Sequence, residues 1–203
     1  MRWNDFTAAA VAATVVAFSA SYACAEEFTA HLKGFNEIGS IPTTTPAATA
    51  PTGYTGAILS DGTGTATLDL DQKAGTIAYT LTYSNVGTTA PLTGTVLFAH
   101  IHFGKSRDSG GILVFFCTNR TFTGTGPTPP ACPNNSGTVT GTWNKANVQT
   151  IPGQNVNAMD FDALVDALTS NTAYANIHTT ALGGGEIRGQ VHAVQKEEHD
   201  RGR

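Results

Sequence analysis

Two histidines separated by one residue are the side chains of this sequence best suited to chemistry. His100 and His102 lie in the stretch AHIHF, residues 99–103, where apolar residues occupy positions 99, 101 and 103. Side chains along a strand alternate between its two faces, so both imidazoles should share one face. We expect the apolar residues to face the core and the two imidazoles to face outward.

A third histidine lies in a later segment with the same alternation. Residues 173–179 read AYANIHT and residues 186–194 read EIRGQVHAV, with three glycines between them, so a hairpin is expected. The polar faces of these two strands carry Asn176, His178, Glu186 and Arg188. If the hairpin is the sheet neighbour of residues 99–103, then His100, His102 and His178 converge.

Three converging histidines would suit a copper or zinc ion. Both metals accept imidazole, and zinc binds histidine nitrogen at roughly 2.0–2.1 Å. Two other interpretations stay open: ordinary surface or hydrogen-bonded histidines, or a polar pocket for a small ligand. In the pocket, Arg188 would bind an anion, and Asn176 and Glu186 would make further contacts. The simplest other role for Glu186 and Arg188 is a cross-strand ion pair of little stability.

No catalytic residue can be named from motifs. The sequence contains no GxSxG, no HExxH and no phosphate-binding glycine loop that leads into a helix. The formal net charge is −4, and no basic stripe or Lys/Arg-rich amphipathic segment is present. We therefore expect neither nucleic acid nor a membrane surface as partner, but an unidentified extracytoplasmic protein or ligand.

The first 25 residues are typical of a signal peptide. Arg2 precedes an apolar stretch at 8–20, which is shorter than the ~20 residues that span a bilayer. The triplet ACA at 23–25 predicts cleavage after Ala25, so the mature protein would be secreted or periplasmic and not inserted in a membrane. A lipid on Cys24 is the alternative, but Ser21 stands where a lipoprotein signal has leucine.

Export makes a disulfide the first interpretation of the remaining cysteines. Removal of Cys24 leaves Cys117 and Cys132, an even pair in an oxidising compartment. A bridge over so short a loop contributes about 3 kcal/mol. The alternative is a pair of free buried thiols.

The pattern of the mature chain predicts an all-β fold of antiparallel strands. Short alternating stretches rich in Thr, Gly, Val and aromatic residues are separated by Gly, Pro and Asn, and residues 64–71 with 76–85 predict a hairpin. One helix is expected at 160–168, with Asp160 as its N-cap. We expect a single domain over residues 26–194, an irregular loop at the proline-containing residues 41–53, and a charged, disordered tail at 195–203.

Three stretches carry a resemblance to a known family. The sequences AHIH at 99–102, YANIHT at 174–179 and GGEIRGQV at 184–191 resemble the CHRD domain, first described in chordin and found in exported bacterial proteins. The resemblance implies an Ig-like or Greek-key β-sandwich and no general enzymatic activity. It favours a non-catalytic binding or structural module, although the growth-factor partners of chordin do not transfer to a lone domain.

A metal-binding protein is the second hypothesis, with copper or zinc on His100, His102 and His178. The HxH strand is also similar to that of copper/zinc superoxide dismutase, but such an enzyme needs several more ligands. Residues 103–137 contain no histidine at all, so superoxide chemistry is the last of the alternatives.

Overall fold

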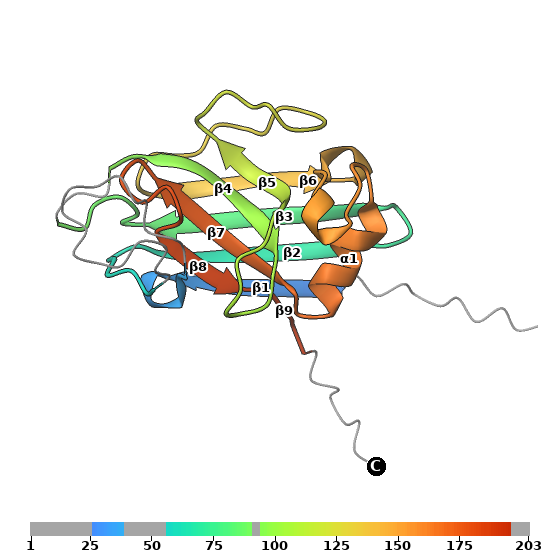
Figure 1. Ribbon diagram of the computed structural model, residues 1–203, viewed down its shortest axis with the longest axis horizontal. Coiled ribbons are helices and arrows are strands. Elements are labelled where there is room, and N and C mark those ends of the chain that lie inside the picture. The colour runs from blue at the N-terminus through green and yellow to red at the C-terminus, as the bar shows by residue number, and fades with distance from the viewer. Residues whose placement is uncertain (1–25, 39–55, 91–93, 196–203) are drawn as a thin grey trace, which may run out of the picture.

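The computed structural model describes residues 26–38, 56–90 and 94–195, in which nine strands form one antiparallel sheet (Figure 1). In chain order the strands are β1 (Glu26–Lys33), β2 (Thr63–Asp71), β3 (Thr76–Ser84), β4 (Val96–Phe103), β5 (Ile112–Thr118), β6 (Gly137–Trp143), β7 (Ala173–Thr179), β8 (Ile187–Gln190) and β9 (His192–Ala193). Their order across the sheet is β5-β4-β7-β8-β1-β2-β3-β6, and β9 pairs with β1. The predicted all-β class and the β2–β3 and β7–β8 hairpins are confirmed.

The predicted helix is confirmed as α1 (Phe161–Thr169). The Asp160 carboxylate accepts a hydrogen bond from the backbone N–H of Ala163 at 3.1 Å, which caps the first turn. Leu164 and Leu168 are buried, so the helix lies against one end of the sheet (Figure 1). The remaining helical pieces are short 3-10 turns: η1 (Gly34–Asn36), η2 (Lys145–Asn147) and η3 (Pro152–Gln154).

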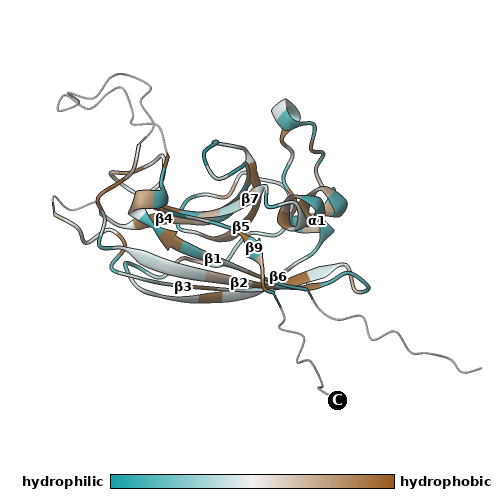
Figure 2. Cartoon of the chain, turned by 90° about the horizontal axis from the view of Figure 1, so that it is seen from below, coloured by the Kyte–Doolittle hydropathy of each residue, from teal (hydrophilic) through white to brown (hydrophobic). Residues whose placement is uncertain are grey.

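The sheet folds over on itself into two packed layers. Figure 2 shows β1, β2, β3 and β6 in one layer and β4, β5 and β7 in the other. Leu68 and Leu81 from the first layer and Ile101 and Phe116 from the second are almost completely buried in the core between them. The architecture is therefore sandwich-like, in the form of one nearly closed sheet. The finer Ig-like arrangement is not confirmed.

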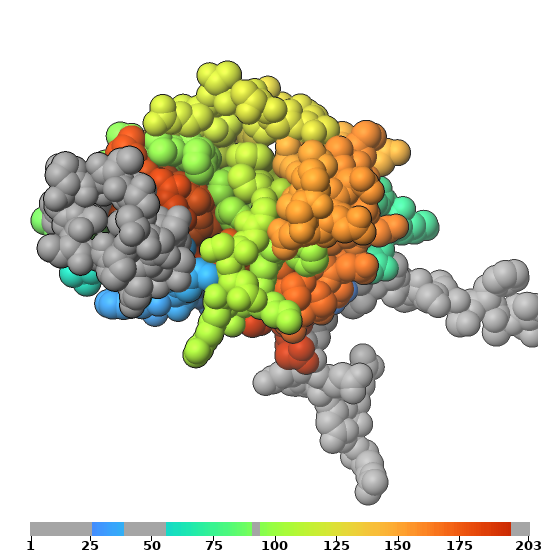
Figure 3. All heavy atoms as spheres, in the orientation of Figure 1, coloured from blue at the N-terminus to red at the C-terminus, as the bar shows by residue number. Residues whose placement is uncertain are grey.

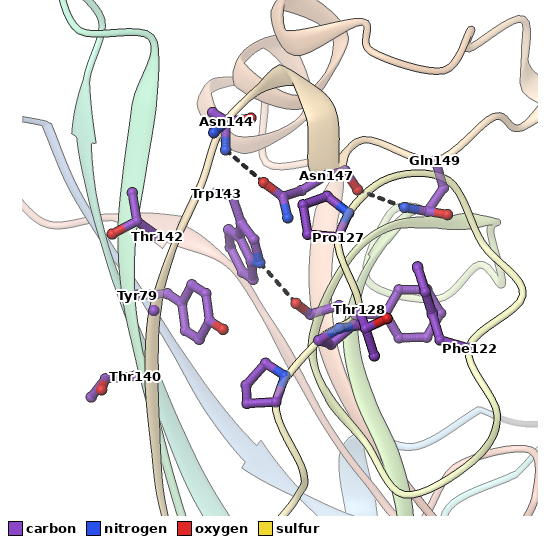
Figure 4. Close-up of a pocket in the computed structure, with 14 residues that line it drawn as sticks. Tyr79, Phe122, Pro127, Thr128, Thr140, Thr142, Trp143, Asn144, Asn147 and Gln149 are labelled. Atoms are coloured by element: carbon purple, nitrogen blue, oxygen red, sulfur yellow. Dashed lines mark hydrogen bonds between the residues drawn. The ribbon is translucent and has the colours of Figure 1, made fainter.

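Side chains bridge the gap where the two ends of the sheet meet. In the described part of the chain no backbone ladder joins β5 to β6. Instead the Trp143 indole N–H donates to the Phe115 carbonyl at 2.8 Å (Figure 4). The Tyr79 hydroxyl donates to the Phe116 carbonyl at 3.0 Å. The Tyr79 and Trp143 rings stack with centroids 4.3 Å apart. These contacts hold the β5 edge, and with it β4, in place.

The predicted disulfide is present in the structure. Cys117 on β5 is bonded to Cys132, and their Cα atoms are 5.0 Å apart. The predicted signal peptide at 1–25, the loop at 41–53 and most of the tail at 195–203 lie outside the described residues. Among the residues that are described, none of the helices has the length and apolar character needed to cross a bilayer.

Candidate metal centre

The register between β4 and β7 brings the three histidines onto one face of the sheet, which we call the histidine wall. His100 is opposite Asn176, Phe98 is opposite His178, and His102 is opposite Tyr174. Side chains at paired positions of an antiparallel ladder lie on the same face, so all six residues share this face. On its other side β4 pairs with β5, and the register shifts on both sides of His100. Such irregularities re-aim side chains and are frequent beside functional sites.

This wall is inside the protein, which corrects the expectation that the imidazoles face outward. His100, His102 and His178 are 1 %, 9 % and 6 % exposed, and every residue of β7 is buried. Two loops cover the wall, at 104–111 and 180–186, and each contributes a carbonyl to a histidine. The three residues are therefore not surface histidines.

Backbone carbonyls set the proton position on two of the rings. The Nδ1 atom of His102 lies 2.8 Å from the Gly110 carbonyl oxygen, and the Nδ1 atom of His178 lies 2.9 Å from that of Gly183. A carbonyl can only accept, so Nδ1 carries the proton and Nε2 presents its lone pair. Gly110 is required at its position, because a side chain there would collide with the Phe103 carbonyl. This is the arrangement by which outer hydrogen bonds orient metal-binding histidines.

The inward nitrogens have no partner in the protein. Five buried side-chain polar atoms of the described residues lack a hydrogen bond, and four of them belong to this cluster: both nitrogens of His100 and the Nε2 atoms of His102 and His178. Buried polar groups are nearly always satisfied, so this concentration indicates a missing ligand. One ligand atom from each ring lies within 4.8 Å of the others. Nitrogens that share one zinc at about 2.0–2.1 Å lie closer together than this, so the three rings would have to approach one another on binding.

The surroundings keep the three imidazoles neutral. Burial lowers the pKa of His102 to about 4, against the hydrogen bond with Gly110, which raises it. Burial also lowers the pKa of His178 to about 3, and the proximity of His102 adds to the effect. Burial, with the charges of the other two rings, holds the pKa of His100 well below its ordinary value. Neutral imidazole is the form that binds metal, so all three donors are available at neutral pH.

Aromatic rings surround the cluster and shield it from water. Phe98 lies 5.0 Å from His100 and 4.8 Å from His178, and Phe115 meets His100 edge-on at 5.1 Å between centroids. Tyr174 stacks on His102 at 4.7 Å with the two planes 7° apart. A dry shell of this kind strengthens the interaction of neutral donors with an ion.

Arg188 supports this shell. Its guanidinium lies 3.3 Å from the centre of the Tyr174 ring, so Arg188, Tyr174 and His102 form one stack. It also donates hydrogen bonds to the Lys105 and Asp108 carbonyls at 2.8 and 2.9 Å. These bonds hold the 104–111 loop that supplies the Gly110 carbonyl. With 2 % of its surface exposed, Arg188 makes these contacts within the protein, and its role as an anion clamp stays a prediction.

The other predicted polar residues lie around the cluster and not in it. The ion-pair interpretation required Glu186 to pair with Arg188, and the structure shows no such pair. Glu186 accepts hydrogen bonds from Ser60, Gly87 and Thr179 instead. Asn176 donates to the Ile187 carbonyl at 3.2 Å and to the Glu37 carboxylate. Both residues serve the frame of the site.

The sequence reasoning missed the aromatic and carbonyl contributions. Tyr174 was given no role, although its alternation with Asn176 and His178 in the sequence is the signal that puts it on the same face. The carbonyls of Gly110 and Gly183 had no signal, because any residue type offers a backbone oxygen.

One comparison with known proteins found a matching family model. The family model described as the CHRD domain matches residues 28–191, which include most of β1, all of β2 through β8 and all three histidines. No curated protein matches the chain.

Proposed function

The chain belongs to the CHRD domain family, and from that premise we propose that it is an exported metal-binding domain in which His100, His102 and His178 hold copper or zinc. The family supplies a rigid β frame without a general enzymatic activity, so the function must be argued from the site. The buried histidine cluster is the reason for preferring the metal-binding alternative to a binding module without metal.

One observation carries the proposal: four unpartnered nitrogens are buried together in a wall of neutral histidines. A buried polar atom without a hydrogen bond costs about 1–3 kcal/mol, so leaving four of them without any ligand would be a large penalty in one place. A metal ion on the three rings would satisfy three of these nitrogens at once. The two Nδ1–carbonyl bonds support the same interpretation because they leave each Nε2 free.

The donor set fits copper or zinc better than calcium or magnesium. Imidazole nitrogen suits the former pair, whereas the latter require oxygen ligands. Three protein nitrogens leave a coordination position for a further ligand, as in zinc sites that act on substrates. A metal bound here would serve storage, sensing or redox chemistry, with the protein supplying orientation and a dry shell.

Metal analysis of purified protein tests the proposal. Protein from the periplasm or culture medium should contain copper or zinc in stoichiometric amount, and His102→Ala should lose it. His192→Ala is the matched control, because His192 is exposed and lies away from the cluster. After chelation, restoring zinc at a hundredfold excess over Kd should stabilise the wild type by about 2.7 kcal/mol.

Two results would contradict the proposal. Metal absent from the wild type, with no thermal stabilisation by either ion, would remove the site. Equal metal content in the wild type and His102→Ala would place the metal elsewhere. Circular dichroism of His102→Ala must match the wild type, so that loss of metal is not loss of fold.

Export and a partner belong to the same proposal. The disulfide supports an oxidising compartment, and the apolar stretch at 8–20 supports a signal peptide. Mass spectrometry of the secreted protein should find an N-terminus at Glu26. An extracytoplasmic partner of the domain stays a prediction, which co-purification with the mature protein would test.

A further inference from the structure

A pocket of about 450 Å³ opens beside the cluster on the side of His100. His100 is the one member of the triad that lines it. The other lining residues come from β4, from β5 and the residues on either side of it, and from the segment that leads into η3: Phe98, Gly111, Ile112, Phe115, Thr118, Arg120, Thr121, Phe122, Thr123, Gly124, Gln149, Thr150, Ile151 and Pro152. In Figure 3 the yellow loop after β5 and the orange segment before α1 flank the green β4–β5 region where this pocket lies.

The inner part of the pocket is aromatic and aliphatic. Phe98 and Phe115 both pack against His100, and Phe122 meets Phe115 edge-on with centroids 5.4 Å apart. Ile112 and Ile151 complete this part of the lining. Rings arranged in this way accept another planar ring by edge or offset contact. The inner part therefore suits an aromatic body.

One cation stands at the rim. Apart from His100, Arg120 is the only ionisable side chain in the described lining, which contains no acidic residue. Its side chain is exposed and has no hydrogen-bond or ion-pair partner among the described residues. Guanidinium binds carboxylate through parallel hydrogen bonds. The rim therefore complements a carboxylate.

The walls are held in place before any ligand arrives. The Arg120 backbone N–H donates to the Thr118 hydroxyl at 3.1 Å, and the preceding residue, Asn119, bonds both the N–H and the carbonyl of Cys132. On the other wall the buried Gln149 side chain bonds both the N–H and the carbonyl of Thr125. A pre-formed pocket avoids the entropy cost of ordering loops on binding.

We propose that this pocket binds a small aromatic carboxylate, with its ring among Phe98, Phe115 and His100 and its carboxylate on Arg120. The inference rests on the proposed function only in placing the molecule next to a bound metal. Once a metal occupies one nitrogen of His100, the other still lacks the carbonyl partner that His102 and His178 have. His100 is therefore the ligand whose environment a pocket occupant can change.

Calorimetry with benzoate and its uncharged analogue benzyl alcohol tests the proposal. Benzoate should bind the folded, zinc-loaded protein, and Arg120→Gln should weaken it about tenfold while leaving benzyl alcohol unchanged. Lys73→Gln is the matched control, because it removes the same charge from the exposed turn between β2 and β3. Thr121→Trp, at an exposed lining position, should weaken both probes by filling the pocket.

The outcomes separate this inference from the metal proposal. Benzoate binding that depends on Arg120, in protein that takes up neither zinc nor copper, would support the pocket and contradict the metal centre. Stoichiometric zinc with no benzoate binding at millimolar concentration would support the metal centre and contradict the pocket. Equal affinity for both probes, or benzoate-induced amide shifts outside residues 98–124 and 147–152, would overturn the inference.

Discussion

In β2 and β3 buried and more exposed residues alternate along most of each strand, whereas all seven residues of β7 are buried. Both regions have the same alternation of apolar and polar residues in the sequence. In the first, the polar face meets water. In the second, it meets the 104–111 and 180–186 loops and becomes a polar interior.

This difference between the two polar faces indicates that the candidate site lies on the buried one. A polar face in water costs nothing to maintain, but a buried one is destabilising unless its groups find partners. Arg188, Glu186 and Asn176 have such partners within the protein. The histidine nitrogens do not. A stable domain can keep such a wall when a ligand completes it.

The largest contrast should come from removing one carboxylate in each region. Glu186→Ala should destabilise the protein by about 3–5 kcal/mol, because Ser60, Gly87 and Thr179 would each lose a buried acceptor. Asp69→Ala, at an exposed position of β2, should change stability by less than about 0.5 kcal/mol. Urea unfolding followed by tryptophan fluorescence measures the free energy of unfolding of both variants. Similar losses of stability would contradict the distinction between the buried and the solvated polar face.

Acid should weaken the metal-free protein through the histidine wall. The folded-state pKa values of about 4 for His102 and about 3 for His178 lie below the ordinary 6.5. Stability should therefore be complete above about pH 6.5 and fall as the pH drops toward 4, since the unfolded chain takes up protons first. His102 alone should contribute on the order of 3 kcal/mol.

A series of urea midpoints across this pH range checks the prediction. The double variant His102→Phe, His178→Phe should show a shallower fall, and zinc should oppose the fall in the wild type. A wild-type slope no steeper than that of the double variant would mean that other groups cause the acid sensitivity.

Reduction of the disulfide should have the next effect, at the edge between the two layers. With a sequence separation of 15, the bridge between Cys117 and Cys132 should contribute about 3 kcal/mol, and the core should keep the fold without it. Thermal unfolding with and without reductant measures the loss. The variant Cys117→Ala, Cys132→Ala should not respond to reductant. Complete unfolding on reduction would show that the core depends on the bridge.

The smallest difference in stability should be the one between removing the Tyr174 hydroxyl and removing the Thr82 hydroxyl. Tyr174→Phe leaves the Gly110 N–H without its acceptor at 3.3 Å and should cost about 0.5–1.5 kcal/mol while keeping the stack on His102. Thr82→Val removes a hydroxyl that contacts Thr138 on the solvated face and should change stability by less than about 0.5 kcal/mol. Hydrogen exchange at Gly110 should accelerate only in the first variant.

Much of the fold was predictable because its signals are local. The β2–β3 hairpin follows from alternation on both sides of a turn, and α1 follows from Asp160 and the spacing of Leu164 and Leu168. The convergence of His100 with His178 could be predicted only on the condition that their strands are neighbours in the sheet. Pairing of β4 with β7 is a long-range contact, which local sequence patterns do not reveal. The path of the sheet around to the β5–β6 edge had no local signal.

The sequence by itself determined which side chains share a face and where turns and the helix begin, and it predicted the pairing of Cys117 with Cys132. Only the tertiary structure decided that the histidine face is buried, that Gly110 and Gly183 orient two of its rings, and that Arg188 stacks on Tyr174. The physical reason is that alternation reports the direction of a side chain relative to its strand. What covers that side chain depends on loops whose course comes from packing of the whole chain.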